Sequence, residues 1–396
     1  MNINYFIRKQ ELILAKIETT FLRKKYFNYL NSSERLIALI GARGVGKTTL
    51  LFQYIKANNI NSLYMTGDDI EFTNSSIYEL TDEFYSLGGR VIVIDEVHKY
   101  KNWAQEIKNI YDSFPDLTIR ISGSSMINIL YEKYDLSRRL VIHNVPVLSF
   151  KEFFEIQKGI ELDSYSLEEI LTNSSEISKK LIFKYQDLYG EFKNYLQYGA
   201  YPFYLEGQES FNSKLYNALE KIIHEDIPSL NKIDYTHITV FEKLIFFVVS
   251  ANNPFDVNVT ALSREFDISV PTLNTYLSIL DKTAIFKSMR KFSKKVSKKP
   301  QKILFANTNI LYAYADKINL ELDIGAVRET FFVNCFENIY YSDIGDFKVD
   351  KHIFEIGGRG KSFSQVKDIK DSYLAIDIDF TSNNNKIPLW LCSFIK

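Results

Sequence analysis

Short apolar runs divide the first third of the chain, and amphipathic segments separate them. The runs have the length of buried strands and lie at 36–40, 62–66, 90–94, 117–121 and 140–145. The segments between them carry apolar residues at helical spacing, for example Trp103, Ile107 and Ile110. Strands that alternate with helices are typical of a parallel sheet. The pattern therefore predicts an α/β domain over residues 1–149, with a helix over residues 1–35 ahead of the first strand.

A different order of elements is expected over residues 235–308. The apolar spacing predicts three amphipathic helices and then a two-stranded hairpin, at 241–248, 259–266, 270–280, 285–292 and 302–305. Ser269 is a favourable N-cap for the third helix. The order helix, helix, helix and hairpin predicts a winged helix, with the third helix as a nucleic-acid reader.

The composition fits a cytoplasmic protein of two or three domains. The chain of 396 residues is 46% apolar and 24% charged, as soluble globular proteins are, and its net charge of -1 excludes a globally basic nucleic-acid binder. Two cysteines are too few for a disulfide framework or a zinc site. Arg8, Lys9 and Glu11 argue against a signal peptide, and the longest strongly apolar run, 244–251, is far shorter than the roughly 18 residues of a membrane span. We therefore expect no membrane partner.

The strongest chemical signal lies between the first strand and the next helix. The stretch Gly41-Ala42-Arg43-Gly44-Val45-Gly46-Lys47-Thr48 fits a phosphate-binding P-loop at every fixed position. A glycine loop at this place turns backbone N–H groups toward phosphates, and the helix dipole favours their charge. We expect Lys47 to reach the β- and γ-phosphates of ATP and Thr48 to bind Mg²⁺, while the Arg43 side chain faces solvent or a partner. The predicted ATP-binding residues are Gly41, Arg43, Gly44, Val45, Gly46, Lys47, Thr48 and Thr49.

A pair of carboxylates follows the third apolar run. Asp95 and Glu96 come directly after the strand that ends at Ile94. The carboxyl ends of parallel strands form the edge at which α/β folds bind ligands. We expect Asp95 to hold Mg²⁺ through its water shell and Glu96 to polarise the attacking water as the catalytic residue. For His98, a relay of nucleotide state and a structural role are both open.

Further catalytic candidates flank the last two runs. In P-loop ATPases with an additional strand beside the P-loop strand, a small polar residue ends that strand and positions the water or the γ-phosphate. Ser124 is the first candidate for this role and Ser122 the second, and a turn that caps the next helix is the alternative. Arg138 and Arg139 precede the fifth run, and we expect them to lie beside the nucleotide edge of the sheet. Either an arginine finger or a pair of surface arginines accounts for them.

The predicted hairpin is strongly basic. Between Lys287 and Lys302 stand only basic charges, and no acidic residue interrupts them. Such a tip would bind DNA phosphates with a steep dependence on salt. Outward positions of the helix 270–280, such as Thr272 and Asn274, offer no Arg or Lys to read guanine, so sequence-specific binding is not expected. DNA contact through the tip and this helix, or a solvated tip on a scaffold, are both open.

Several blocks together resemble a large group of prokaryotic AAA+ ATPases. These blocks are GARGVGKTT, IDEVHKYKNW, ISGSSMINIL, the DLSRRL–LSFKEFFE segment and YLQYGAYP. The resemblance implies an AAA+-type P-loop NTPase core, a helical lid at 150–234, and a small α/β domain at 309–396 that is similar to PD-(D/E)xK nucleases. Relatives of this kind often complete their site with an arginine from a neighbouring chain, and the oligomeric state is left open.

The nuclease-like resemblance points to three carboxylates in the last domain. The residues that occur in the matching order are Glu329, Asp350 and Glu355. In that fold two carboxylates hold a metal, and a lysine two positions after the last of them assists the water. Gly357 stands at the position of that lysine. Lys361 or Lys367 would have to supply the amine, or else the site is degenerate.

Three functions are consistent with these features. The first is an AAA+ switch or motor, in which ATP binding and hydrolysis reposition the winged helix and the C-terminal domain on a nucleic-acid or protein partner. The second is an ATP-regulated, metal-dependent DNA nuclease. The third is a non-catalytic, ATP-gated protein-interaction switch. The P-loop and the carboxylate pair favour the first.

Overall fold

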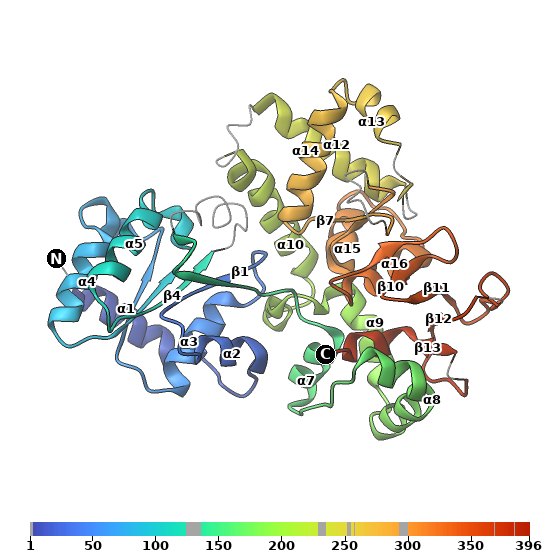
Figure 1. Cartoon of the computed structure of the whole chain (residues 1–396), viewed down its shortest axis with the longest axis horizontal. Coiled ribbons are helices and arrows are strands. Elements are labelled where there is room, and N and C mark those ends of the chain that lie inside the picture. Colours follow the sequence, from blue (N-terminus) through green and yellow to red (C-terminus); the bar gives the residue numbers. More distant parts are fainter. Residues whose placement is uncertain are drawn as a thin grey trace. The chain divides into compact units, whose positions relative to one another are not determined.

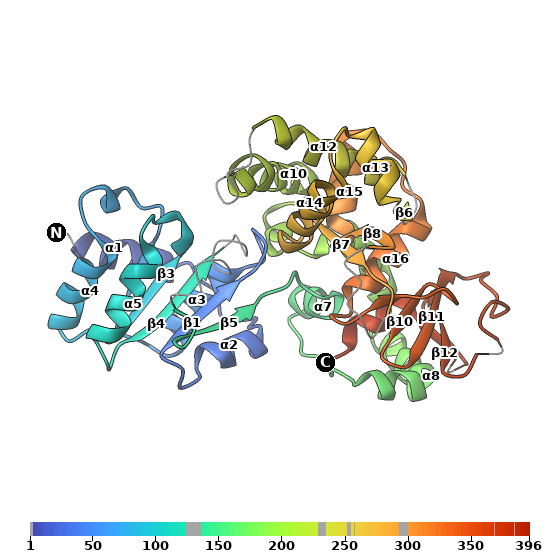
Figure 2. The same ribbon diagram turned by 45° about the horizontal axis from the view of Figure 1, so that its top comes forward.

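Residues Met1–Val147 fold as one unit and residues Leu148–Lys396 as a second (Figures 1 and 2). The computed structural model describes residues 3–123, 136–228, 235–251, 255–256, 258–292, 300–367, 369–383 and 385–396. None of the helices within these ranges is long and apolar enough to cross a membrane.

The first unit is built on a parallel sheet. Its strands are β1 (Leu36–Ile40), β2 (Ser62–Thr66), β3 (Val91–Asp95), β4 (Thr118–Gly123) and β5 (Leu140–Asn144). They lie in the order β2-β3-β4-β1-β5, and every pairing is parallel. The predicted α/β fold is confirmed, and β4 is the additional strand between the P-loop strand β1 and β3. All carboxyl ends of these strands therefore meet at one edge.

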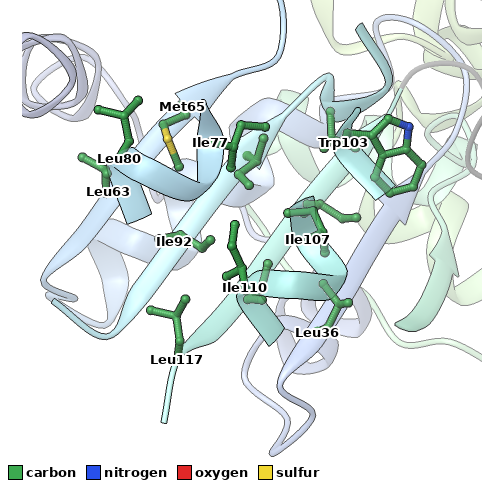
Figure 3. Packing of buried hydrophobic residues seen from close by; sticks show 14 of the residues in the cluster. Leu36, Leu63, Met65, Ile77, Leu80, Ile92, Trp103, Ile107, Ile110 and Leu117 are labelled. Carbon is green, nitrogen blue, oxygen red and sulfur yellow. The ribbon is translucent and has the colours of Figure 1, made fainter. Parts of the chain in front are cut away.

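Helices cover both faces of this sheet. They and two short 3₁₀ turns are α1 (Ile3–Leu14), α2 (Lys24–Leu30), α3 (Lys47–Ala57), η1 (Ile70–Thr73), α4 (Ile77–Ser86), η2 (Val97–Lys99) and α5 (Trp103–Ser113). On one face, Ile92 of β3 packs with Ile77 of α4 and Ile107 of α5 in a buried cluster (Figure 3). On the other face, Phe52 of α3 contacts Tyr64 of β2, with ring centroids 4.3 Å apart. Successive strand residues point to opposite faces, so a sheet covered on both faces favours strands that are apolar at successive positions, as β1 is.

The helix expected ahead of the first strand is interrupted. α1 ends at Leu14 and α2 begins at Lys24. Between them, the side-chain amide of Gln53 on α3 donates hydrogen bonds to the carbonyls of Glu18 (3.0 Å) and Phe21 (2.9 Å). These carbonyls are satisfied by a side chain from another helix, which removes the need for helical bonding there. The apolar spacing of the segment alone did not reveal this break.

The second unit contains a mixed sheet at its C-terminal end. Its strands are β9 (Tyr340–Tyr341), β10 (Phe347–Val349), β11 (His352–Gly358), β12 (Ser372–Asp377) and β13 (Lys386–Pro388). They lie in the order β13-β12-β11-β10-β9. Pairing is antiparallel from β9 to β11 and parallel from β11 to β13. Helix α16 (Ile324–Asn334) packs against β11. The nuclease-like character of this region stays a prediction.

The helices expected to form a lid belong to the second unit. They and the turns between them are α7 (Phe150–Lys158), α8 (Leu167–Lys184), α9 (Leu188–Asn194), η3 (Tyr195–Gly199), η4 (Pro202–Glu206), α10 (Phe211–Lys221) and η5 (Ile222–Asp226). α8 packs on β13, and α7 packs on the last turn, η6 (Leu389–Phe394), where the rings of Phe150 and Phe394 lie 6.3 Å apart. These helices therefore share the core of the C-terminal sheet. A role as lid over a nucleotide stays a prediction.

Along the chain, the elements expected as a winged helix come after these helices and before the C-terminal sheet. They are α12 (Tyr235–Ser250), β6 (Phe255–Asp256), α13 (Val259–Glu265), α14 (Val270–Lys282), β7 (Phe286–Met289) and β8 (Lys302–Phe305), and α15 (Thr308–Lys317) follows. The three strands pair in the order β6-β8-β7. Ser269 caps α14 by accepting a hydrogen bond from the backbone N–H of Thr272 (3.2 Å). The three helices and the hairpin follow one another as expected, whereas β6, between α12 and α13, is a strand that the spacing did not predict. A winged helix stays a prediction.

Candidate functional site

The P-loop turns from β1 into α3 through glycines that other residues could not replace easily. Gly44 (φ 80°) and Gly46 (φ 92°) have left-handed backbone. A β-carbon on Gly41 would lie 2.3 Å from the carbonyl oxygen of Val145. No side chain among the described residues caps the start of α3 at Gly46. The start of a helix after a glycine loop favours an anion such as a phosphate.

Lys47 places a cation inside this loop. It is only 5% exposed, and its Nζ donates hydrogen bonds to the carbonyls of Gly41 (3.0 Å) and Ala42 (2.9 Å). An ammonium group bonded to carbonyls at the loop can exchange these partners for phosphate oxygens. Arg43 is half-buried in the loop, and Thr49 is exposed on the first turn of α3. The residues predicted to bind ATP thus share one loop and one helix start.

Asp95 ends β3 and joins three neighbouring elements. Its Oδ2 accepts hydrogen bonds from the hydroxyls of Thr48 (2.5 Å) and Tyr64 (3.1 Å), and its Oδ1 accepts one from Ser122. Burial, followed by the charge of Asp95, raises the pKa of Tyr64 far above its usual range, so this tyrosine stays a donor. The two predicted metal ligands, Thr48 and Asp95, therefore lie together. The sequence offered only a weak signal for Tyr64, a hydroxyl-bearing residue between Leu63 and Met65.

Glu96, the predicted base, follows Asp95 in an unusual conformation. Its backbone is left-handed (φ 47°), which is uncommon for a residue with a side chain. Its N–H donates to Oδ1 of Asp95 (3.1 Å) and to Oγ of Ser122 (3.3 Å). Its side chain is 22% exposed, and its Oε2 lies 3.6 Å from Nε2 of His98. A carboxylate thus stands beside the candidate metal ligands, with an imidazole next to it.

Ser122 is the serine of β4 that reaches this site. Its hydroxyl bonds to Asp95, and its oxygen accepts the N–H of Glu96. β4 lies between β1 and β3, which brings the end of the strand between the two motifs. Ser124, our first candidate, lies outside the described residues. Among the described residues, it is therefore Ser122, our second candidate, that contacts Asp95 and Glu96.

Arg138 and Arg139 lie at the edge of the sheet opposite to the P-loop. They precede β5, which runs parallel to β1 with Leu140 beside Leu36, whereas the P-loop follows the other end of β1. The length of a strand of this size, about 16 Å, separates the two edges. Arg139 forms two hydrogen bonds with Asp112 of α5 (2.9 and 3.0 Å), and Arg138 is exposed. The expected position beside the nucleotide edge is thus corrected. A role toward a neighbouring chain stays a prediction.

The described lysines of the basic hairpin are engaged within the second unit. Nζ of Lys287 donates to the carbonyls of Val333 (2.8 Å) and Phe336 (2.6 Å), and burial lowers its pKa to about 8. Lys291 and Lys302 each pair with a carboxylate. DNA contact and a solvated tip were both open for the hairpin, and Lys287 and Lys302 instead bond within the second unit. Residues 293–299, which hold four further lysines, lie outside the described residues.

A second group of charged side chains lies between α16, β8 and β11. Lys302 pairs with Glu329 (2.8 Å) and Lys361 with Glu355 (2.5 Å). The side chains of Glu329 and Glu355 are 16% and 3% exposed. Burial raises the pKa of Glu329 to about 7, and nearby Asp346 adds to the rise while Lys302 opposes it. Burial also raises the pKa of Glu355, against the hydrogen bond from Lys361. These groups share one low-dielectric environment.

Asp346, rather than Asp350, is the strand aspartate beside this group. β10 and β11 pair antiparallel, so Asp346, just before β10, lies beside Glu355 of β11. Its Oδ2 accepts the backbone N–H of Ile356 (2.7 Å). Asp350 lies in the turn at the other end of the hairpin, with a left-handed φ of 52°. The expected grouping of Asp350 with Glu355 is corrected, because the sequence did not show which end of the hairpin faces the helix.

Lys361 occupies the space of the missing lysine. A β-carbon on Gly357 would lie 2.5 Å from both Cβ and Cγ of Lys361. The ammonium group of Lys361 reaches Glu355 from there. Lys367, the other candidate, is exposed. Lys361, six residues after Glu355 rather than two, thus supplies an amine to the Glu355 carboxylate.

The fold and the first site define a class of protein. A parallel sheet with an additional strand, a P-loop after β1 and an Asp-Glu pair after β3 are the features of a P-loop NTPase. Residues 33–154 match the family model of the AAA domain. Residues 189–321 match the model of a domain of unknown function, DUF8612. The first unit therefore contains an AAA-type P-loop ATPase domain.

Three known proteins are similar to the chain over most of its length. It is 28% identical over 343 residues to the uncharacterized protein MJ1637 of Methanocaldococcus jannaschii, which covers 80% of this chain and 72% of that protein. The Walker-type ATPase PABY2304 of Pyrococcus abyssi matches with 15% identity and a TM-score of 0.43, over 74% of this chain and 95% of that chain. The RuvB Holliday junction branch migration motor of Thermotoga maritima matches with 14% identity and a TM-score of 0.29, over 81% and 95%.

Proposed function

We propose that the first unit binds ATP with Mg²⁺ and hydrolyses it. The observation that carries this proposal is the hydrogen bond between Thr48 of the P-loop and Asp95 of β3. It brings the oxygens of Thr48 and Asp95, the two proposed Mg²⁺ ligands, together at the start of the phosphate-binding helix α3. Hydroxyl and carboxylate oxygens suit this hard cation, and the uncapped start of α3 suits phosphate.

Each residue of the site has a separate part in this proposal. Bound MgATP would supply the phosphoanhydride bond and a metal that stabilises charge on the phosphates. Lys47 and the first N–H groups of α3 bind phosphate oxygens. Thr48 and Asp95 hold the cation, and Ser122 fixes the orientation of Asp95. Glu96 polarises the attacking water.

ATP turnover by purified protein tests the proposal. The Lys47→Ala variant should lose turnover to the level of buffer, because it lacks the cation of the loop. Lys101→Ala, which removes an exposed lysine of the same unit, is the matched control and should keep the wild-type rate. A wild-type protein that does not hydrolyse ATP, or a Lys47→Ala variant that hydrolyses it normally, would contradict the assignment.

We further propose that nucleotide state repositions the second unit on a partner, with DNA as the first candidate. The support is the lysine content of residues 293–299 together with the helix α14. Fluorescent DNA titrated at several salt concentrations should show binding that weakens steeply with salt, and replacement of the four lysines by serine should flatten the dependence. Weak binding that does not change with salt would favour a protein partner, as in a non-catalytic interaction switch.

A second candidate function is metal-dependent cleavage of DNA by the second unit. The observation that favours it is the grouping of Glu329, Asp346 and Glu355 with the amine of Lys361. Two carboxylates of such a group would hold the cation, and the lysine would assist the water. The competing explanation is a structural network, since Lys302 and Lys361 already pair with two of the carboxylates.

A further inference from the structure

The backbone of Glu96 is fixed from both sides. Its left-handed conformation is held by hydrogen bonds from its N–H to Asp95 and Ser122, and its carbonyl accepts the N–H of Lys99 (2.9 Å). A residue with a side chain keeps such a conformation only where its surroundings impose it. The conformation therefore has a structural cause that can be traced to named neighbours.

Gly67, at the end of β2, makes room for this conformation. A β-carbon on Gly67 would lie 2.5 Å from the carbonyl oxygen of Glu96. The N–H of Gly67 also donates to the carbonyl of Asp95 (2.8 Å). The Gly67 backbone thus holds the carbonyl of Asp95, the residue before Glu96, and leaves room for the carbonyl of Glu96. The side chain of Glu96 therefore leaves the backbone in a fixed direction.

The direction of that side chain brings it to His98. Nε2 of His98 lies 3.6 Å from Oε2 of Glu96, and both residues belong to the turn that includes η2. The imidazole is 4% exposed, whereas the Glu96 side chain is 22% exposed. A buried ring has fewer accessible orientations than a partly solvated carboxylate. In this pair the ring is therefore the fixed group and the carboxylate the adjustable one.

We propose that His98 is a positioning residue for Glu96. Its imidazole, whose Nε2 lies 3.6 Å from Oε2 of Glu96, keeps the Glu96 carboxylate in the orientation that polarises the attacking water. The inference rests on the proposed ATPase function and adds an orienting group to it. A catalytic base commonly needs a third group to orient it, and an imidazole within reach of a carboxylate can fill that part. The contact of His98 is to the proposed base Glu96, so its effect should fall on turnover.

The test compares His98→Ala and His98→Phe with wild type by steady-state ATP turnover and by binding of a fluorescent ATP analogue. We expect kcat to fall tenfold or more, with KM and the affinity for the analogue within twofold of wild type. His98→Phe keeps the ring volume, so it remains informative if His98→Ala does not fold. His98→Gln, which retains an N–H donor, should recover part of the rate. His143→Ala removes another ring of the same unit, one that stacks on Tyr29, and should keep kcat.

A second arm places the same changes in a Glu96→Gln background. There, single-turnover rates with and without His98→Phe should agree within twofold, because the positioned group is already lost. A wild-type kcat in His98→Phe, a rise in KM that accounts for the loss, or losses that multiply with Glu96→Gln would each overturn the inference. Failure of the proposed function is distinguishable, since wild type would then show no turnover sensitive to Lys47→Ala.

Discussion

The hydroxyl of Thr48 lies 2.5 Å from the carboxylate of Asp95, although 47 positions separate them in the chain. Thr48 lies in the first turn of α3, after the P-loop, and Asp95 ends β3, which lies two places from the P-loop strand β1 in the sheet. The two motifs to which they belong are recognisable separately in the sequence. Their contact shows that the parallel sheet brings the two motifs together at one edge.

Loss of the Ser122 hydroxyl should slow ATP turnover and leave the affinity for metal-free ATP unchanged. Ser122→Ala removes a hydrogen bond to a charged group, worth about 1.5–3 kcal/mol, which corresponds to roughly 10- to 100-fold in rate if it is needed for reaction. Steady-state kinetics and nucleotide binding measure the two effects separately. Ser86→Ala, at an exposed position on α4, is the control. An unchanged rate in Ser122→Ala would show that Asp95 does not depend on this donor.

Substitution of Gly67 should damage both stability and turnover. A β-carbon there would lie 2.5 Å from the Glu96 carbonyl oxygen, so Gly67→Ala must shift the backbone that carries the base. Overpacking of this kind costs about 1–3 kcal/mol in the free energy of unfolding. Gly190→Ala meets no atom within 4 Å and should raise stability by about 0.5–1 kcal/mol, because alanine is the better helix former in α9. Urea denaturation tests both, and effects of the same sign would contradict the prediction.

The raised pKa of Glu329 should make stability fall with pH. Its ordinary value is 4.5, and burial raises it to about 7 in the folded protein. The folded state therefore binds this proton more tightly than the unfolded chain does. The resulting stability is present in full below pH about 4.5 and is lost as pH rises through about 7.

The Glu329→Gln variant removes this titration and should reduce the decline in unfolding free energy between pH 5 and pH 8. The expected reduction is on the order of 1–3 kcal/mol. Urea denaturation at the two pH values measures it, and Glu337→Gln, at an exposed position, is the control. The same decline in Glu329→Gln as in wild type would show that another group is responsible.

Cleavage of DNA, if the second unit performs it, should depend on Asp346 and not on Asp350. Asp346→Asn and Glu355→Gln should abolish cutting in Mg²⁺ or Mn²⁺, because they remove carboxylates of the buried group. Asp350→Asn changes an aspartate in the turn of the same hairpin and should leave cutting intact. A gel assay on linear DNA separates these outcomes. No cutting by wild-type protein with either metal would remove the nuclease function.

The sheet of the first unit was predictable because its signals are local. Each strand is an apolar run, and the P-loop and Asp95-Glu96 follow such runs directly. The same pattern also determines the position of Arg138 and Arg139, and the predicted position beside the nucleotide edge was wrong. Residues that precede a parallel strand lie at the edge opposite to the residues that follow its neighbour.

Other features depend on contacts between distant parts of the chain. The inward direction of Lys287 is set by carbonyls of α16 and the residues after it, and no sequence spacing indicates this. The break after Leu14 depends on Gln53 of another helix. The place of Asp346 depends on which end of a hairpin meets α16. In each case the deciding partner lies far away in the sequence.

The three hydroxyls around Asp95 have a consequence for the affinity of the site for a cation. Thr48, Tyr64 and Ser122 fix this carboxylate when the chain folds. Its rotational freedom is therefore lost at folding and not when a cation arrives, and only the bond to Thr48 needs to be exchanged. Ordering a side chain costs up to about 1–2 kcal/mol. The Asp95 carboxylate is therefore preorganised, and cation binding avoids most of that entropic cost.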